Sequence, residues 1–543
     1  MADAFRADAP QDGDAVTDTR GAVVFALAVA SALVVGVAAG PVATLSPAAG
    51  YALGVTVFAA VLWLTGAIPL SLTALAIPVL LVAFGVVPDF GDAVTGFADP
   101  VVFLLLAGFM LAEALQSHGI DRRVAYHVLL RLGTSPRRLV LAVMIVTALL
   151  SMIISNTATT AMMIPVAIGL VAEVTDVWAA DATERGDTAA TDETASPSAD
   201  ADPSNFQLAM LLGVAYAASL GGVGTLVGTP PNAIVVGQLR ELLDYHVSFL
   251  DWLLVGLPMV VVTLPVAWVL LTVVVYPPQV GDVSDARESA RRGLAAAGEM
   301  DADARRTVLI FALTAALWLL GGLGFLVRPA LPAAVYTTLF GGAGRSVFGT
   351  AGHEGLLYYV LVGLAAVVAL VVSGAAAWDD LLDVDWGTLV LLGGGISLAN
   401  ALVTTGATEW LASVTLGALG PAPLPVVVLV VVTLVVVVGE LASNTAMAAI
   451  LAPLLVGIGP AYADALGTSA PTAAAFLALV GAVAASYGFA LPVATPPNAI
   501  AYGAGYMDKD DMLRAGLPLD AVVILLATGV LTLLLRFVWP VVL

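Results

Sequence analysis

The chain of 543 residues contains no cysteine, only four histidines and a single lysine, Lys509. The absence of cysteine excludes disulfides, thiolate metal sites and cysteine nucleophiles. His353 and Glu354 begin a zinc-protease-like pattern, but Leu357 stands where the second histidine is needed. No phosphate-binding Walker loop is present, so an ATP-driven cycle is not expected. We therefore expect that the chain is not an enzyme.

Charge is also scarce, because 11% of the residues are charged and 60% are hydrophobic. A soluble domain of this length does not have such a composition, whereas a multi-pass membrane protein does. The net charge of −21 arises mostly in polar segments such as 3–18 and 181–202. Two explanations of this acidity stay open: ordinary solvated loops, and a host with a salty cytoplasm.

The first 20 residues are acidic and are expected to be disordered. An apolar run from Gly21 to Ala39 follows them. A signal peptide needs a basic start and a small-residue cleavage site, so this run is predicted to be retained as the first membrane helix.

Two polar tetrapeptides interrupt the long apolar stretches, Ser155-Asn156-Thr157-Ala158 and Ser443-Asn444-Thr445-Ala446. Each is followed by the hexapeptide Thr-Pro-Pro-Asn-Ala-Ile, at 229–234 and at 495–500. Polar residues and helix breakers are costly in a bilayer, so their duplication predicts one site made by two related halves. Further residues recur at matching offsets in both halves: Ala161 and Ala449, Pro165 and Pro453, Gly169 and Gly457, Gly237 and Gly503.

A full membrane crossing needs about 20 residues. The paired spans 139–154/158–175 and 424–442/446–460 are shorter, and each pair is interrupted by Ser-Asn-Thr. We interpret them as re-entrant hairpins with tips at 155–157 and 443–445, and uninterrupted helices are the alternative. The predicted fold is an all-α membrane protein, an inverted-repeat secondary transporter with two re-entrant hairpins and 11 transmembrane helices at 21–39, 50–65, 69–88, 101–117, 206–222, 252–276, 307–327, 356–374, 386–404, 472–493 and 517–539.

The basic residues predict the orientation. With the N-terminus inside, only Arg240, Arg328, Arg345 and Arg536 of the 19 basic residues lie outside, which fits the positive-inside rule. In this topology the first hairpin enters from the cytoplasm and the second from outside. The two repeats are then inverted, as alternating access needs.

A hairpin tip in the membrane leaves helix-end backbone groups unpaired. The second arms, beginning near Ala158 and Ala446, present free N–H groups and a positive dipole end, which suit an anion. Carbonyl groups freed at the tips and at the Pro-Pro breaks suit a hard cation such as Na⁺. Helix packing is the alternative for one polar triplet. Two triplets with two hexapeptides in the same order favour a shared binding site.

These paired motifs resemble the divalent anion/sodium symporter family, the sodium-dicarboxylate/sulfate symporters of solute carrier family 13. The resemblance covers residues 20–540 and rests on Ser-Asn-Thr twice, with Gly-Thr-Pro-Pro-Asn and Ala-Thr-Pro-Pro-Asn. It implies a homodimer whose protomers carry a scaffold domain and a transport domain that moves as an elevator. The implied parts are scaffold 21–118 and 307–404, interfacial helices 119–136 and 405–418, transport domain 139–276 (with an acidic loop at 181–204) and 424–543, and a cytoplasmic loop 277–306.

The resemblance also implies site residues. The first sodium site would use Ser151, Ser155, Asn156 and Gly228, and the second Gly439, Ala442, Asn444 and Ala494. The substrate would meet Ser155, Asn156, Thr157, Thr229, Pro230, Ser443, Asn444, Thr445, Thr495 and Pro496.

One position departs from the family pattern. Gly439 stands where the family often has Thr, so the second sodium site is expected to be weaker or completed by water. Glu440 beside it is an intramembrane acid, for which cation tuning, proton binding and structural pairing all stay open. Glu113 and Glu409 lie near span ends and are expected at the interface.

The resemblance thus implies a sodium-coupled symporter of small divalent anions (a di- or tricarboxylate such as succinate, or sulfate) in the cell membrane, with a cytoplasmic N-terminus. Its partners would be the anionic substrate, Na⁺, the lipid bilayer and a second copy of the chain, and no nucleic acid. The alternatives are a related ion transporter of the arsenite, citrate or Na⁺/H⁺ type, and an uncoupled anion channel.

Overall fold

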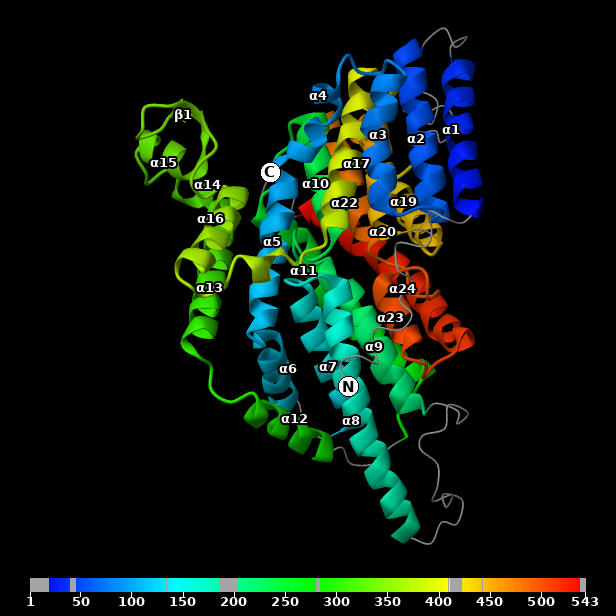
Figure 1. Ribbon diagram of the computed structural model, residues 1–543, viewed down its shortest axis with the longest axis vertical. Coiled ribbons are helices and arrows are strands. Elements are labelled where there is room, and N and C mark those ends of the chain that lie inside the picture. Colours follow the sequence, from blue (N-terminus) through cyan, green and yellow to red (C-terminus); the bar gives the residue numbers. More distant parts are fainter. Residues whose placement is uncertain are drawn as a thin grey trace.

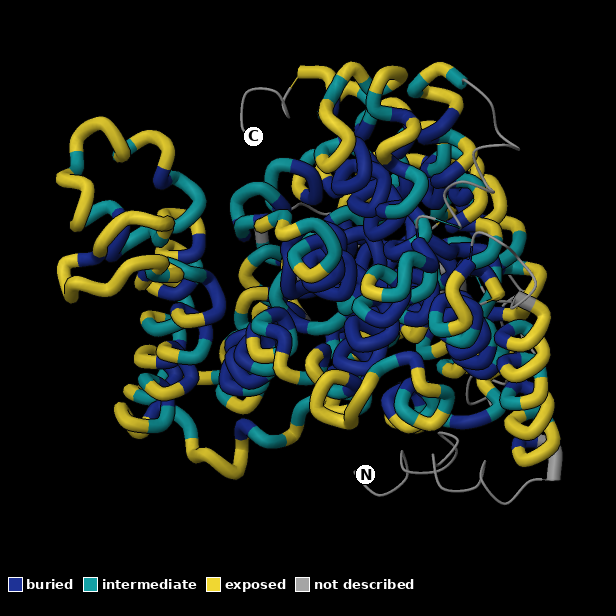
Figure 2. The backbone as a smooth tube through the Cα atoms, turned by 90° about the horizontal axis from the view of Figure 1, so that it is seen from above, coloured by how far each residue is buried: buried dark blue, intermediate teal, exposed yellow. Residues whose placement is uncertain are grey.

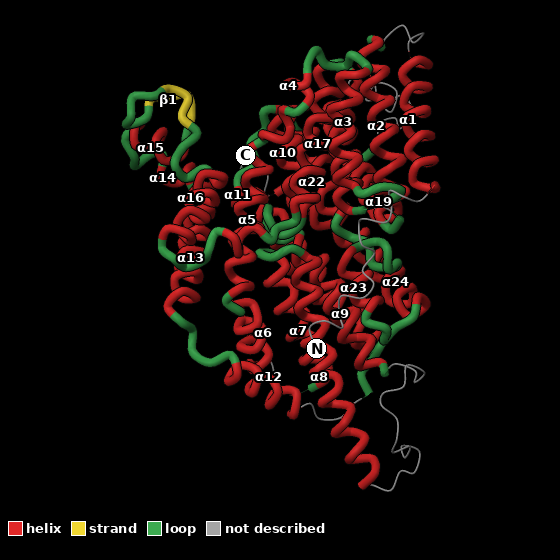
Figure 3. Tube along the Cα trace, in the orientation of Figure 1, coloured by secondary structure: helices red, strands yellow, loops and turns green. Residues whose placement is uncertain are grey.

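A computed structural model describes residues 19–39, 45–131, 135–184, 204–279, 284–408, 410, 422–441 and 443–537. In this part of the chain the elements are helices, apart from one small antiparallel pair of strands (Figure 3). The predicted N-terminal segment 1–20 lies almost entirely outside the described residues, as does most of the predicted helix at 405–418.

The first half of the chain begins with α1 (Thr19–Ala39), α2 (Pro47–Thr65), α3 (Leu70–Ala83), α4 (Phe90–Ala93), α5 (Pro100–Ser117) and α6 (Ile120–Arg131). It continues with α7 (Pro136–Ser151), α8 (Asn156–Glu184), α9 (Asn205–Gly222), α10 (Pro230–Leu243), α11 (Phe249–Val269) and α12 (Ser284–Ala296). A π-helical turn, Leu270–Val275, extends α11. In Figure 1, α1, α2 and α3 stand side by side at one edge of the molecule.

The second half begins with α13 (Ala302–Gly322), α14 (Gly324–Val327), α15 (Ala333–Phe340), β1 (Gly342–Arg345), β2 (Ala351–His353), α16 (Tyr359–Val372) and α17 (Trp386–Thr404). It ends with α19 (Leu424–Gly439), α20 (Asn444–Ile458), α21 (Ala463–Leu466), α22 (Ala470–Ala485), α23 (Pro496–Gly503) and α24 (Lys509–Phe537). Figures 1 and 2 place α13 to α16 and the strand pair at the edge opposite α1.

Exposed apolar surface lies mainly on the outer helices. In the described residues, eight helices are long and apolar enough to cross a membrane, and five shorter apolar helices accompany them. The apolar windows of α1 and α13 are only 22% buried, whereas that of α17 is 67% buried. Figure 2 shows the buried residues in the middle and the exposed ones at the rim. Exposed apolar faces on outer helices suit a bilayer, and the count of eleven crossings stays a prediction.

Both Ser-Asn-Thr runs lie where one helix ends and the next begins. In the first half α7 ends at Ser151 and α8 begins at Asn156; in the second, α19 ends at Gly439 and α20 begins at Asn444. The described helices are therefore interrupted here, and the alternative of uninterrupted helices is wrong. The depth of these turns in a membrane stays a prediction.

Each Thr-Pro-Pro-Asn run also follows a break between two helices. The first break is the non-helical segment 223–229, and the second is 486–495. Because proline has no backbone N–H, it suits the first turn of a helix, where that group has no partner. Pro230 therefore begins α10 and Pro496 begins α23, and the preceding helices end earlier, at Gly222 and Ala485. The expected single span over 472–493 is wrong, because its last eight residues belong to the break.

A glycine packs against each break at matching positions. A Cβ atom added to Gly256 would lie 2.3 Å from the carbonyl oxygen of Val223, and one added to Gly516 would lie 2.1 Å from that of Phe489. Both glycines begin the sequence Gly-Leu-Pro, on α11 and on α24. The internal repeat therefore extends to the helices that follow the two breaks.

Three segments differ from the sequence-based expectations. α8 continues to Glu184, four residues into the predicted acidic loop 181–204. The predicted loop 277–306 contains α12, and the connection after α13 contains α15 and the strand pair. Gly349, at positive φ, permits the tight turn that joins the two strands.

Candidate functional site

The two Ser-Asn-Thr tips meet at one cavity. Its volume is about 500 Å³. Each of the ten residues predicted to bind substrate lines it, namely Ser155, Asn156, Thr157, Thr229, Pro230, Ser443, Asn444, Thr445, Thr495 and Pro496. The structure therefore brings together two motifs that lie almost 300 residues apart in the chain.

Four helix N-termini line this cavity, those of α8, α10, α20 and α23. At α20 no side chain caps the first turn, so the early backbone N–H groups stay available. At α8 only a 3.3 Å contact from the Ala158 amide to Ser155 Oγ is made. All four N-termini add partial positive charge, but the free N–H donors come from α8 and α20, because α10 and α23 begin with two prolines and Thr495 Oγ1 accepts from the Asn498 amide. The side of the cavity formed by the tips therefore suits an anion without any basic side chain.

The rest of the cavity wall comes from α5, from the segment just before α17 and from the first turn of α17. Glu113, Gln116, Asp383, Asp385 and Thr388 line it, and none of them was predicted as a site residue. Glu113 lines this cavity, and its expected position at the membrane interface stays a prediction. No motif marks these residues, because they belong to the non-repeated surface that the tips face.

A second cavity, of about 830 Å³, shares Glu113, Gln116 and Ala161 with the first. Arg122, Tyr126 and Arg292 line its far side, between α6 and α12. The Arg123 guanidinium donates hydrogen bonds to the carbonyl oxygens of Ala297 and Gly298, at 2.6 and 2.7 Å, and so fixes the C-terminal end of α12. The site between the tips therefore continues towards the face that carries α12.

Oxygen atoms cluster at the first predicted sodium site. Ser151 Oγ lies 2.6 Å from Asn156 Oδ1 and donates to the carbonyl oxygen of Ala218 at 2.7 Å. The same Oδ1 lies 3.3 Å from the carbonyl oxygen of Gly228. If the Asn156 amide is turned, its nitrogen donates hydrogen bonds to these oxygen atoms. If Oδ1 stays where it is, a bound cation could balance the same group of oxygen atoms. The cluster fits a hard cation, which prefers oxygen ligands.

Glycines make room for this cluster. A Cβ atom on Gly228 would lie 2.6 Å from the carbonyl oxygen of Gly222 and 2.9 Å from that of Ser151. A Cβ atom on Gly222 would lie 2.2 Å from Asn156 Oδ1. Three of the four predicted ligands, Ser151, Asn156 and Gly228, thus pack directly around one another. Ser155 lies beside them on the tip and lines the substrate cavity.

The second predicted sodium site is sparser. Asn444 is 9% exposed and its Oδ1 has no hydrogen-bond partner among the described residues. A Cβ atom on Gly439 would have only the carbonyl oxygen of Tyr487 nearby, at 3.7 Å. Ala494 is buried in the second break, and Ala442 lies outside the described residues. The Oδ1 of Asn444 could therefore contact a cation or the substrate. The hydroxyl of Ser151 in the first site has no counterpart in the second, because the matching residue is Gly439.

Two acidic side chains hold the second break. Glu440 accepts hydrogen bonds from the backbone amides of Ala490 at 3.1 Å and Leu491 at 2.8 Å. Asp520 accepts one from the Phe489 amide at 3.1 Å. Three consecutive amides are therefore bound by carboxyl groups. Of the three roles expected for Glu440, the hydrogen bonds from Ala490 and Leu491 show the structural pairing. Glu409 lies outside the described residues.

Polar contacts join α10 to Tyr358, which precedes α16, and to α17. Arg240 donates to the Tyr358 hydroxyl at 2.8 Å and lies 3.4 Å from Glu354 Oε1. Asn400 on α17 donates to Glu241 at 3.0 Å. Burial raises the pKa of the nearby Asp99 carboxyl, and the Val101 amide and Arg240 offset part of this effect.

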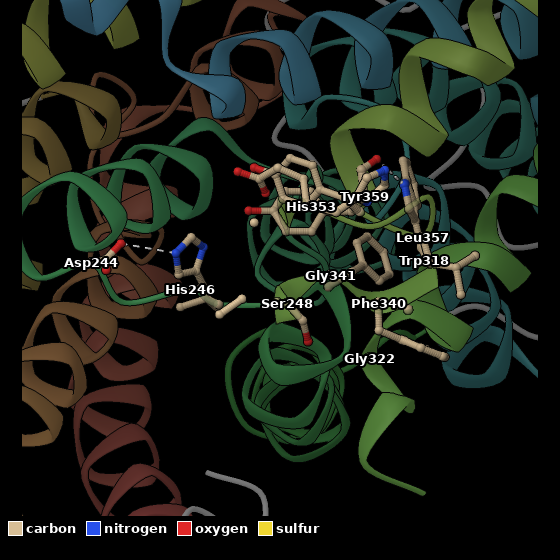
Figure 4. A pocket seen from close by; sticks show the side chains of 18 residues that line it. Asp244, His246, Ser248, Trp318, Gly322, Phe340, Gly341, His353, Leu357 and Tyr359 are labelled. Atoms are coloured by element: carbon tan, nitrogen blue, oxygen red, sulfur yellow. Dashed lines mark hydrogen bonds and ion pairs between the residues drawn. The ribbon is translucent and has the colours of Figure 1, made fainter. Parts of the chain in front are cut away.

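A third cavity, of about 650 Å³, lies beside these contacts (Figure 4). His246, paired with Asp244 at 3.3 Å, and Ser248 come from the connection between α10 and α11. His353 and Tyr359 come from the region of the strand pair and α16. No predicted site residue lines this cavity, so it is separate from the site between the tips.

Comparison with known proteins agrees with this architecture. A solved structure of the YdaH transporter of Alcanivorax borkumensis superposes with a TM-score of 0.50 over 82% of this chain and 87% of that one, at 17% identity. That likeness shows a shared fold. The family model "Sodium:sulfate symporter transmembrane region" matches residues 22–542, and the chain belongs to this family.

Relatives with assigned names are transporters as well. An "Uncharacterized transporter" of Haemophilus influenzae is 32% identical over 89% of this chain and 91% of its own length. The "Sodium-dependent dicarboxylate transporter SdcS" of Staphylococcus saprophyticus is 29% identical over 90% of this chain and 86% of its own. The family and these relatives are named as symporters and transporters, which is consistent with the expectation drawn from the sequence.

Proposed function

We propose that this protein is a sodium-coupled secondary active symporter of small divalent anions, a di- or tricarboxylate such as succinate, or sulfate. The observation that carries this proposal is the cavity of about 500 Å³ on which four helix N-termini converge, lined by both Ser-Asn-Thr tips. Its positive end is made of backbone dipoles and neutral side chains, which bind an anion and also release it.

The anion would be held from two sides. The tip of one half, Ser155 to Thr157, and the tip of the other, Ser443 to Thr445, both line the same cavity and supply it with hydroxyl and amide donors. A molecule with two separated oxygen-rich groups satisfies both tips at once. Thr229 and Thr495, which directly precede the prolines of α10 and α23, add a hydroxyl on each side.

Sodium would bind behind each tip. At the first site the oxygen atoms of Ser151, Asn156 and Gly228 form the ligand cluster, and Asn156 also faces the substrate cavity. A cation bound there would attract the anion in the neighbouring cavity and lower the free energy of anion binding. It would also order the Ser155–Thr157 tip, which contacts that anion. Coupling follows because one asparagine serves both sites.

An elevator movement is the mechanism that this arrangement supports. The transport domain would comprise 139–276 and 424–543, and the scaffold 21–118 and 307–404, in a homodimer. With the N-terminus cytoplasmic in the cell membrane, the tip cavity continues towards the inner face beside α12, and the contacts of Arg240 close the outer face. The structure would then represent an inward-facing state.

Uptake by proteoliposomes tests the proposal. Under an inward sodium gradient, labelled succinate or sulfate should accumulate above its equilibrium level. Uptake that is unchanged when choline replaces Na⁺ would rule out sodium coupling. Flux that never exceeds equilibrium would indicate an uncoupled channel, and accumulation driven by a proton gradient alone would indicate a transporter of the Na⁺/H⁺ type.

Competition then identifies the anion. Succinate, citrate, sulfate and phosphate, each at tenfold excess over the labelled substrate, should reduce uptake in the order of their fit between the two tips. A dicarboxylate reaches both tips with separate carboxylates, whereas sulfate places one compact group between them.

A further inference from the structure

The asparagine of each Thr-Pro-Pro-Asn run ties its break in the same way. Asn232 Nδ2 donates to the carbonyl oxygens of Gly222 at 3.0 Å and Thr225 at 2.7 Å. Asn498 Nδ2 donates to those of Gly488 at 3.1 Å and Leu491 at 3.0 Å. In both halves the acceptors stand ten and seven residues before the asparagine. Both asparagines are completely buried.

The segment between the second acceptor and the asparagine carries a predicted sodium ligand at the same place in each half. The amide of Gly228 donates to Thr225 at 3.4 Å, and the amide of Ala494 donates to Leu491 at 3.2 Å. Gly228 and Ala494 each stand four residues before the asparagine. The carbonyl oxygen of Thr225 thus accepts from both Asn232 and the Gly228 amide. That of Leu491 likewise accepts from both Asn498 and the Ala494 amide.

The surroundings of the two breaks otherwise differ. In the first half, Thr225 Oγ1 donates to the carbonyl oxygen of Met152, and Trp252 Nε1 donates to that of Val223. In the second half, the carboxyl groups of Glu440 and Asp520 bind the amides of the break instead. The asparagine hydrogen bonds are common to both halves even though the neighbouring contacts differ. What the two breaks share is a predicted sodium ligand, Gly228 or Ala494, so a role in the sodium sites is favoured.

We propose that Asn232 and Asn498 are positioning residues for the two sodium sites, each holding a break so that the backbone of Gly228 or Ala494 faces the cation. This inference rests on the proposed sodium coupling and adds two residues to it. Neither asparagine lines the substrate cavity. Their loss should weaken sodium binding first and substrate binding only through it.

A sodium titration of thermal stability tests the proposal on purified protein, because a ligand that binds the folded state raises the unfolding temperature. Sodium replaces choline at constant ionic strength, and the apparent sodium dissociation constant, here called the sodium midpoint, is obtained by fitting the logarithmic rise of stability with sodium concentration. Asn232→Leu and Asn498→Leu keep the side-chain volume and remove the donors. Losing two hydrogen bonds from a ligand turn should raise the sodium midpoint about tenfold.

Gln238→Ala is the matched control. Gln238 is equally buried on α10, and its Nε2 donates to the carbonyl oxygen of Ala449 at 3.1 Å, away from the break. This variant should unfold at a lower temperature in choline and keep the wild-type sodium midpoint. Where Asn232→Leu does not fold, Asn232→Ser keeps one shorter donor and should give an intermediate shift.

Uptake kinetics give the second readout. Each asparagine variant should raise the sodium concentration for half-maximal uptake, while the substrate KM at saturating sodium stays within about threefold of wild type. Variants that unfold earlier but keep the wild-type sodium midpoint would overturn the positioning role. A wild-type protein that shows no sodium response would instead contradict the sodium coupling, and this inference with it.

Discussion

Arg240 on α10 donates a hydrogen bond to the Tyr358 hydroxyl at 2.8 Å, and its guanidinium also lies 5.8 Å from the centre of the same ring. α10 belongs to the proposed transport domain, and Tyr358 precedes α16 in the proposed scaffold. This contact therefore crosses the surface along which the two domains would slide, at the end away from α12.

Cross-linking this contact should stop transport. Because the chain has no native cysteine, Arg240→Cys with Tyr358→Cys gives a single reactive pair. A short, cleavable thiol cross-linker should abolish succinate uptake by holding α10 against the scaffold, and cleavage should restore it.

The control pair is Arg306→Cys with Ser373→Cys. Arg306 on α13 donates to the Ser373 carbonyl oxygen at 3.3 Å; it directly precedes the proposed scaffold segment 307–404, which contains the rest of α13 and Ser373. Cross-linking this pair should leave uptake unchanged. Full uptake in the cross-linked Arg240/Tyr358 pair would contradict relative movement of the two domains.

A hydroxyl added at Gly439 should strengthen the second sodium site. The position matches Ser151 of the first site, and an added Cβ atom meets nothing closer than the Tyr487 carbonyl oxygen at 3.7 Å. One more oxygen ligand is comparable to a hydrogen bond of about 1 kcal/mol, so Gly439→Ser should lower the sodium midpoint about fivefold. An unchanged or higher midpoint, measured by sodium titration of the unfolding temperature, would place the second cation elsewhere.

Glycines at the breaks should resist substitution. Gly516→Ala would place a Cβ atom 2.1 Å from the Phe489 carbonyl oxygen, so the break must shift, at a cost of about 1–3 kcal/mol. Gly529 lies on the same helix with nothing within 4 Å of an added Cβ atom, and Gly529→Ala should be neutral or slightly stabilising. Thermal unfolding of the two variants compares them directly, and equal stability would contradict the packing described for α24.

Glu440 should matter for stability through the amides that it binds. Glu440→Ala leaves the amides of Ala490 and Leu491 without an acceptor, and each unpaired buried group costs about 1–3 kcal/mol. Glu440→Gln keeps one carbonyl acceptor and should fall between Glu440→Ala and wild type. Identical unfolding temperatures for all three proteins would show that the carboxylate does not hold the break.

The paired motifs predicted the centre of the site, and the reasons are local. Ser-Asn-Thr and Thr-Pro-Pro-Asn are costly in a membrane unless they serve a break or a ligand, so their duplication located both tips and both breaks. The missing hydroxyl at Gly439 was visible in the same way, by comparing the copies. The starts of α10 and α23 followed from proline chemistry.

Other parts of the site could not be predicted in this way. Glu113 and Asp383 line the cavity from segments without any repeat, and only the fold brings them opposite the tips. The hydrogen bonds of Asn232 and Asn498 depend on the path of the break, which the hexapeptide alone does not reveal. The Gly-Leu-Pro repeat at Gly256 and Gly516 was a signal in the sequence that this comparison of motifs missed.

The most direct test of the shared site is sodium-driven succinate uptake by Asn156→Ala and Asn444→Ala, each reconstituted beside wild type and Gln238→Ala. Each asparagine lies on one tip of the common cavity, and each is predicted to serve both the anion and a cation. Loss of both roles should reduce uptake by each variant at least about hundredfold, equivalent to two contacts of about 1.4 kcal/mol each, while Gln238→Ala still transports. Wild-type uptake by both tip variants would contradict the account.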